Sequence, residues 1–148
     1  MKSQDKHMKY AVSACLMGIN CKYDGGNNEH IKLQEFLKDK EYILICPEVA
    51  GGMSVPRIPC EIKNGVVLNR HGEDMSEYFR LGAQKELQKL KKHKIDVVIL
   101  QPRSPSCGIG QIYDGSFTKT LIQKNGIFAQ ACINENITVL SPDDVIYL

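Results

Sequence analysis

Long hydrophobic runs are absent from this sequence of 148 residues. The longest apolar stretches, residues 42–46 and 97–100, are far shorter than the roughly 20 residues that a membrane-spanning helix needs. A signal peptide is not visible either, because the polar residues 1–7 lead directly into a short apolar segment. We therefore expect a cytoplasmic protein that makes no contact with a membrane.

An excess of charge of one sign is also lacking, since 19 Lys and Arg face 17 Asp and Glu. This balance gives no broad electrostatic footprint for nucleic acid and leaves room for a small anionic ligand. A hydrophobic content of 43% excludes a disordered chain. No repeat or linker divides the sequence, whose length is typical of one domain. We expect a flexible polar segment over residues 1–8 and a single domain over residues 9–148.

Short apolar runs alternate with helical patterns along the chain. The expected strands cover residues 9–15, 42–46, 95–100 and 137–140, and the expected helices cover residues 31–37, 74–93 and 126–134, with Asp74 as an N-cap. The continuous apolar run 42–46 predicts a parallel strand covered on both faces, followed by a loop over residues 48–59. Asn64-Gly65 predicts a small hairpin insertion. The pattern indicates a three-layer, Rossmann-like α/β fold on a mostly parallel sheet, whose ligands bind beyond the carboxyl ends of the strands.

Three of the six cysteines lie where these strands end. Cys15 ends the first strand, Cys46 ends the second, and Cys107 follows the third. Because parallel strands share one carboxyl edge, the three thiols could converge and bind zinc or an iron–sulfur cluster. The alternative is that each cysteine is a small buried hydrophobic residue. No CxxC pair is present, so the spacing does not decide between these alternatives.

Polar residues suited to catalysis lie in the same loops. Glu48 is a candidate general base, with a surface carboxylate as the alternative. Ser104 and Ser106 precede the third cysteine, although serines more often cap turns. Arg57 and Arg103 are candidate partners of an anion, or else they pair with nearby carboxylates and shape the loops.

The other three cysteines have weaker assignments. Cys132 falls on the inward face of an apolar helix, which predicts a core position. Cys60 has no obvious partner. Cys21 lies near enough to Cys15 to be a spare ligand.

Five short motifs are recognisable as a set: SACLMG at 13–18, CPEVAGGM at 46–53, PR at 56–57, SPSCG at 104–108 and DGSF at 114–117. In this order they make the chain, from about Lys9 to its end, resemble the iron–sulfur dependent thiouracil desulfidase family, formerly a domain of unknown function. The resemblance implies a desulfidase-like α/β domain with a [4Fe–4S] cluster that has one iron free of protein ligands. Its ligands would be Cys15, Cys46 and Cys107.

The resemblance also implies the roles of other residues. Glu48 and Ser104 would be catalytic, and substrate contacts are expected from Ser13, Arg57, Arg103 and Ser106. One departure from the family pattern is Cys60, where a small residue such as Ala is expected. This extra thiol would either add a ligand or be neutral.

The implied reaction is non-redox removal of sulfur from a thiolated pyrimidine, giving the oxo pyrimidine and hydrosulfide. The open iron would act as a Lewis acid on the thiocarbonyl, and Glu48 would take a proton from the attacking water. Two other functions use the same thiolates: a zinc-dependent hydrolase, and a module that binds or carries an iron–sulfur cluster without catalysis. The sequence leaves the substrate open among free base, nucleoside, nucleotide and RNA, and it leaves open whether the chain forms a homodimer. We expect thiouridine monophosphate to be preferred over thiouracil.

Overall fold

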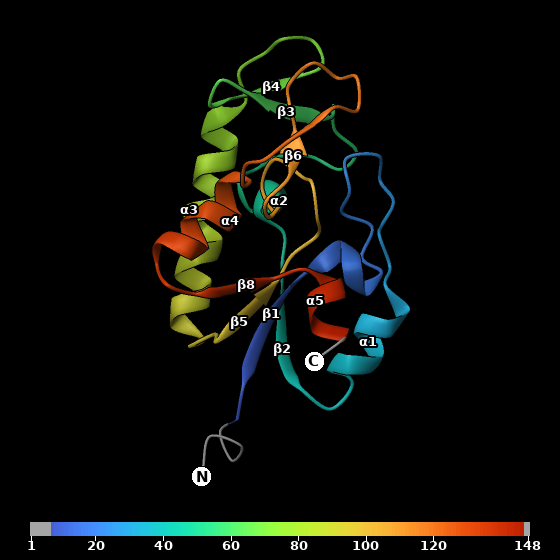
Figure 1. The fold of residues 1–148 in the computed structure, drawn as a ribbon, viewed down its shortest axis with the longest axis vertical. Coiled ribbons are helices and arrows are strands. Elements are labelled where there is room, and N and C mark those ends of the chain that lie inside the picture. The colour runs from blue at the N-terminus through green and yellow to red at the C-terminus, as the bar shows by residue number, and fades with distance from the viewer. Residues whose placement is uncertain (1–6, 147–148) are drawn as a thin grey trace.

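A central sheet of four parallel strands organises the molecule (Figure 1). This computed structural model describes residues 7–146, so the predicted flexible segment lies mostly outside the described residues. The strand order is β2-β1-β5-β8, with β1 at Lys9–Ser13, β2 at Glu41–Ile45, β5 at Val97–Ile99 and β8 at Thr138–Leu140. All three pairings are parallel, as the apolar runs predict.

Helices cover both faces of this sheet. Alternate residues of β1 point to opposite faces, so Tyr10 and Val12 pack in one apolar core and Ala11 packs in another. The first core includes residues of α1 (Ile31–Leu37) and α5 (Pro142–Ile146), and the second includes residues of α3 (Ser76–Lys92) and α4 (Ile127–Asn134). The predicted three-layer α/β fold is confirmed. Within the described residues, no helix is long and apolar enough to cross a membrane.

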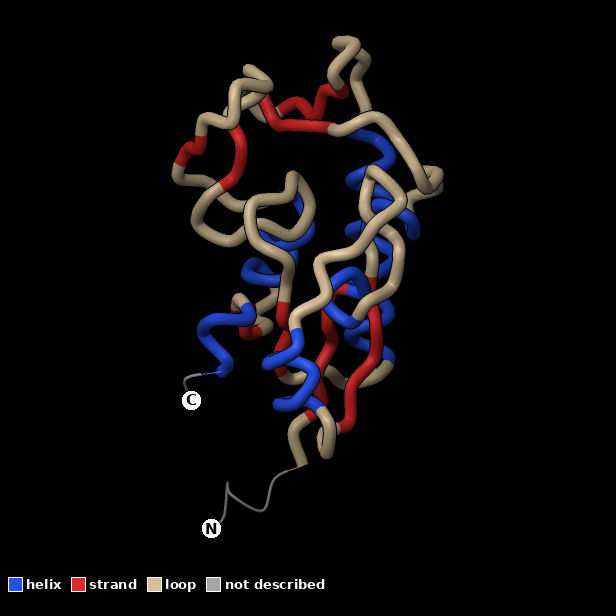
Figure 2. The backbone as a smooth tube through the Cα atoms, turned by 90° about the vertical axis from the view of Figure 1, so that its right-hand side faces the viewer, coloured by secondary structure: helices blue, strands red, loops and turns tan. Residues whose placement is uncertain are grey.

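Two small hairpins lie beyond the carboxyl ends of the central strands (Figure 1). The predicted hairpin insertion is confirmed: β3 (Cys60–Lys63) pairs with β4 (Val66–Asn69), and the turn residues Asn64 and Gly65 have φ angles of 51° and 80°. The second hairpin, β6 (Ile112–Tyr113) with β7 (Leu121–Ile122), was not predicted. Figure 2 shows that many of the loop segments gather at this end of the molecule.

The stretch after β2 differs from the prediction. Residues Pro47–Ala50 form the short helix α2, not a loop, because proline suits the first position of a helix, where its missing N–H costs nothing. β2 is an edge strand, so Glu41 and Tyr42 are exposed and the expectation of a strand covered on both faces is wrong for its first half. These differences matter for function, because α2 begins directly after Cys46.

Smaller differences concern the ends of elements. β1 stops at Ser13, and a 3-10 helix, η2 (Ala14–Met17), follows it. Helix α3 begins at Ser76 with Met75 as N-cap, so Asp74 is not the cap, although its carboxylate accepts a hydrogen bond from the Ser76 N–H at 2.9 Å. The C-terminal helix α5 was not predicted.

Candidate functional site

A cavity of ≈ 410 Å³ opens beyond the carboxyl ends of the central strands. Five of the six cysteines line it: Cys15, Cys21, Cys46, Cys60 and Cys107. The sixth, Cys132, is fully buried among core residues, as predicted. Cys15, Cys46 and Cys107, which follow three strands of the sheet, thus line one cavity together with two further thiols.

Three of these thiols, Cys15, Cys21 and Cys46, lie close enough to shift one another's pKa. The Asn28 side-chain amide donates a hydrogen bond to the Cys15 sulfur at 3.7 Å. The neighbouring Cys21 thiol lowers the pKa of Cys15, whereas Cys15 raises the pKa of Cys21 to about 11, and Cys21 and burial raise the pKa of Cys46. Metal binding at Cys46 would therefore release a proton.

Cys107 is held by a loop that rests on the N-terminus of α4. The first N–H groups of this helix bond to carbonyls of the loop: Ile127 to Pro105 and Phe128 to Ser106, both at 2.8 Å. A helix leaves its first N–H groups without intrahelical partners, so the loop carbonyls satisfy them. This docking fixes the loop that carries the thiol. A Cβ at Gly126 would lie 2.6 Å from the Ser106 carbonyl oxygen, so the contact needs glycine.

Three serines surround the Cys107 side chain and backbone. The Ser13 hydroxyl donates to its sulfur at 3.7 Å, and the Ser104 hydroxyl accepts the Cys107 N–H at 2.7 Å. The Ser106 hydroxyl lies 3.7 Å from the same sulfur and 3.4 Å from Glu48, and its single proton is shared between these two acceptors. Burial raises the pKa of the Cys107 thiol to about 12. Ser104 thus caps the turn, which was the alternative considered for it, and it also lines the cavity.

Helix α3 holds the segment that carries Cys46. The Cys46 N–H donates to the carboxylate of buried Glu86 at 2.8 Å, and Lys89 donates to the Leu44 carbonyl at 2.8 Å. Gly82, four residues before Glu86 and so on the same face of α3, lies against the backbone of Pro47. Glu86 was missed at the sequence level, because a carboxylate in a Lys-rich helical run is typical of a solvated face.

Replacing Gly82 by Ala should therefore destabilise the protein. A Cβ at this position would clash with the Pro47 carbonyl oxygen, and overpacking of this kind costs about 1–3 kcal/mol, more than the helix propensity of Ala returns. Urea unfolding measures the effect. Gln84→Ala, at an exposed position of the same helix, is the control and should leave the midpoint almost unchanged. Equal midpoints for the two variants would contradict this packing.

Glu48 lies in the first turn of α2, with 18% of its side chain exposed. Its carboxylate is 3.5 Å from the Arg57 guanidinium and accepts a hydrogen bond from the Ser106 hydroxyl at 3.4 Å. The interpretation of Glu48 as a free surface carboxylate is wrong, since the residue faces the cavity between two fixed partners.

The Arg57 side chain is almost fully buried and pairs with the Glu48 carboxylate. This is the alternative to anion binding that the sequence left open for Arg57. Its Nη2 donates to the Cys21 carbonyl at 3.0 Å and its Nη1 to the Ser54 carbonyl at 3.2 Å. Its buried Nε has no hydrogen-bond partner within residues 7–146. Arg103 also lines the cavity, but it is exposed and no ion pair is found for it among the described residues.

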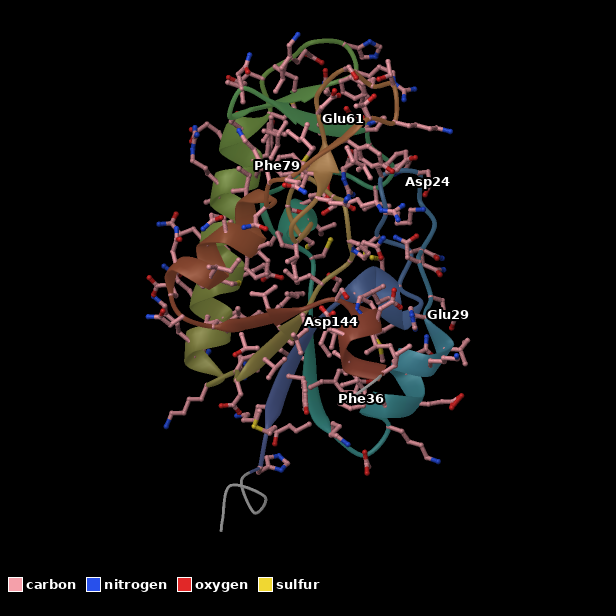
Figure 3. The ribbon with its side chains drawn as sticks, in the orientation of Figure 1. Asp24, Glu29, Phe36, Glu61, Phe79 and Asp144 are labelled. Carbon is pink, nitrogen blue, oxygen red and sulfur yellow. The ribbon has the colours of Figure 1, made fainter. Side chains whose placement is uncertain are left out.

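Further cations and aromatic rings complete the cavity wall. They are Lys22, Arg70, Lys119, Tyr23, Tyr113 and Phe117. The Arg70 guanidinium lies 5.6 Å from the centre of the Phe117 ring. Glu61, labelled in Figure 3 beside the hairpins, accepts the N–H groups of Gly115 and Phe117 at 3.0 and 3.1 Å and so holds this wall in place. Sequence reasoning gave these residues no role, although the DGSF motif was the signal for one of them.

The donor set of the cavity is dominated by thiols. Cys60 differs from the others in its surroundings: its thiol donates to the Ile58 carbonyl at 3.6 Å, and burial raises its pKa to about 12. In the part of the chain that the structure describes, no group of three or more His, Cys, Asp or Glu side chains is placed to hold a metal ion.

Comparison with known proteins gives three consistent results. A family model described as 2-thiouracil desulfurase matches residues 10–144. The uncharacterized protein YbbK of Bacillus subtilis (strain 168) is 35% identical over 144 residues, covering 90% of this chain and 95% of that protein. The solved structure of the [4Fe-4S]-dependent thiouracil desulfidase TudS has a TM-score of 0.88 and 33% identity, with 95% of each chain covered.

Proposed function

The chain belongs to the 2-thiouracil desulfurase family, and from this we propose that it is an iron–sulfur enzyme that hydrolyses the C–S bond of a thiolated pyrimidine. The observation that carries the proposal is the convergence of Cys15, Cys46 and Cys107 with Glu48 on one cavity. The reaction consumes water and converts a thiocarbonyl to a carbonyl, releasing hydrosulfide, so no electron donor is needed.

The residues present fit a [4Fe–4S] cluster. Thiolates are the protein ligands of such clusters, and Cys15, Cys46 and Cys107 come from the ends of three neighbouring parallel strands. The similar TudS structure is described as [4Fe-4S]-dependent. When bound, the cluster would supply an iron without a protein ligand, which is a Lewis acid for the soft thiocarbonyl sulfur.

Glu48 is assigned the role of general base. A base must lie within hydrogen-bond reach of the attacking water and keep a fixed orientation. Arg57 and Ser106 both contact Glu48 Oε2, which leaves Oε1 to accept the proton of a water in the cavity. Arg57 and Ser106 thereby orient Glu48. Ser106 does not line the cavity and is almost fully buried, so it has this role in place of the substrate contact expected of it.

Ser104 is assigned a donor role toward the substrate. Its hydroxyl oxygen accepts the Cys107 N–H and lies 3.4 Å from the Ser106 hydroxyl, so the oxygen is fixed and its proton turns from Ser106 to a substrate in the cavity. Ser104 lines the cavity, whereas Ser106 is almost fully buried behind it. Ser13, which donates to the Cys107 sulfur, holds that thiol and accepts the Gln101 N–H at 2.9 Å.

The fixed position of Glu48 favours catalysis over a role in carrying a cluster. A carrier needs the three thiolates but not a carboxylate held by Arg57 and Ser106 at the cavity wall. A zinc-dependent hydrolase would use Glu48 in the same way, so the metal has to be tested directly.

Oxygen-18 labelling tests the hydrolytic reaction. Cluster-loaded protein is incubated anaerobically with 4-thiouracil in labelled water, and both products are measured. We expect uracil that carries the label and one hydrosulfide for each uracil formed. Unlabelled uracil, or hydrosulfide release without uracil, would show that water is not the nucleophile.

Phosphate on the substrate should increase the efficiency of the reaction. Arg103 is exposed at the cavity wall without an ion-pair partner among the described residues, and hydrogen bonds to charged groups contribute about 1.5–3 kcal/mol. We therefore expect kcat/KM for 4-thiouridine monophosphate to exceed that for 4-thiouracil by about 10-fold or more. Arg103→Ala should remove most of this preference.

The kinetic effect of Arg57→Ala should differ from that of Arg103→Ala. Arg57→Ala also removes the ion pair that orients Glu48, so it should lower kcat for both substrates. Arg80→Ala is the matched control, since Arg80 is exposed on α3 and pairs with Glu77 away from the cavity. Equal efficiency of the parent enzyme with base and monophosphate would disprove the preference. If Arg103→Ala keeps the full preference for the monophosphate, Arg103 is not the residue that binds the phosphate.

A further inference from the structure

We propose that Cys15 and Cys21 form a reversible disulfide when the cavity holds no metal, which makes Cys21 a redox modification site. Cys21 lies outside the three-thiol set assigned to the cluster, yet it is only 8% exposed and lines the same cavity. The inference concerns the metal-free chain, so it stands independently of the proposed reaction.

The two sulfur atoms are already neighbours. Cys15 and Cys21 belong to one buried core cluster and line the same cavity, where each thiol shifts the pKa of the other. The chain turns back between them, since Gly18 has a φ of 85° and the Ile19 N–H bonds to the Ala14 carbonyl at 3.3 Å. A disulfide needs this proximity, because cysteines that are held apart cannot be joined without movement of the backbone.

Backbone contacts hold both members of the pair in place. Arg57 donates to the Cys21 carbonyl at 3.0 Å, and the Cys15 carbonyl accepts the N–H of Asn28 at 2.9 Å. The Asn28 side chain then reaches the Cys15 sulfur from the same segment. Thiols that are fixed next to each other lose little further freedom when they are joined, which favours an intramolecular disulfide over a mixed one.

The other cysteines have different surroundings. The Cys60 thiol donates to a backbone carbonyl, Cys107 lies beside two serine hydroxyls, and Cys132 is fully buried away from the cavity. Cys46 is also near Cys21, but it is only partly buried against the core cluster of which Cys15 and Cys21 are both buried members. The pair within the continuous segment 15–21 is therefore the one we assign.

A small disulfide such as oxidised glutathione supplies the oxidant. One thiolate of the pair attacks it, forming a mixed disulfide and releasing one glutathione thiol, and the second thiol of the pair then displaces the other glutathione. Two protein thiols are oxidised, and the two electrons reduce one glutathione disulfide to two thiols. The product is reduced again by thiols, whereas sulfinic and sulfonic acids are not, so the pair protects a cluster ligand from permanent damage.

The test uses the full-length chain, freed of metal by chelation and treated anaerobically with oxidised glutathione. We expect the intact mass to fall by two hydrogens, four thiols to remain of the original six, and peptide mapping to join Cys15 to Cys21. Dithiothreitol should restore all six thiols and the capacity to take up iron.

Two variants make the result specific. The Cys60→Ser variant, altered in the same cavity, should still form the disulfide. In the Cys21→Ser variant, Cys15 should remain a free thiol or form a mixed disulfide with glutathione. An intramolecular disulfide in Cys21→Ser, a parent disulfide mapped to another pair, or six free thiols after treatment would each overturn the proposal. Because no turnover is measured, failure here is distinguishable from failure of the proposed function.

Discussion

Replacement of Glu48 by Gln is expected to lower kcat by about 100-fold or more, the usual scale for loss of a general base, while iron content stays at the parent level. The amide has nearly the same shape as the carboxylate and still accepts the Ser106 hydroxyl, but it cannot take a proton from water. Anaerobic hydrosulfide release measures the rate, and the iron content of the same samples measures retention of the cluster.

Glu61→Gln is the matched control for this variant. Glu61 also lines the cavity, but its carboxylate only accepts backbone N–H groups, which the Gln carbonyl oxygen can still do. Its rate should stay within a few-fold of the parent. A Glu48→Gln enzyme that releases hydrosulfide at the parent rate would remove Glu48 from the mechanism.

Single replacement of Cys15, Cys46 or Cys107 by Ser should lower iron affinity by at least about 10-fold, since even the loss of a group that only supports a metal ligand costs this much. A serine oxygen is a poor substitute for thiolate on iron. Iron and sulfide are counted after anaerobic reconstitution and gel filtration, and the brown colour should fade in parallel.

Cys60→Ser and Cys132→Ser are the controls for the ligand assignment. Cys60 lines the cavity but faces a backbone carbonyl, and Cys132 lies in the core. Both should retain iron. Equal iron retention in all five variants would show that the ligand set is wrong, and loss of iron in Cys60→Ser would add a fourth ligand.

The fold was largely predictable because its main elements carry strong local signals. The apolar runs at 42–46 and 97–100 predict two strands of the main sheet, and Asn64-Gly65 predicts the first hairpin. The second hairpin has strands of two residues each, which are too short to show a period of two. The sequence predicts a loop where helix α2 forms, because Pro47 and the following glycines are also typical of turns.

The candidate site was predictable only in part. Parallel topology was enough to bring Cys15, Cys46 and Cys107 together, because strand ends share one edge. Contacts that depend on packing between distant segments were not accessible: Glu86 with the Cys46 N–H, and Cys21 between two other thiols. These depend on the exact course of the chain between elements, which no sequence period encodes.

The most direct test compares one preparation of the chain in three forms: metal-free, loaded with zinc, and loaded with a [4Fe–4S] cluster. Each form is incubated anaerobically with 4-thiouridine monophosphate, and hydrosulfide and the oxo nucleotide are measured together. The account predicts stoichiometric release of both products by the cluster-loaded form alone. Turnover by the zinc form, or none by the cluster-loaded form, would contradict it.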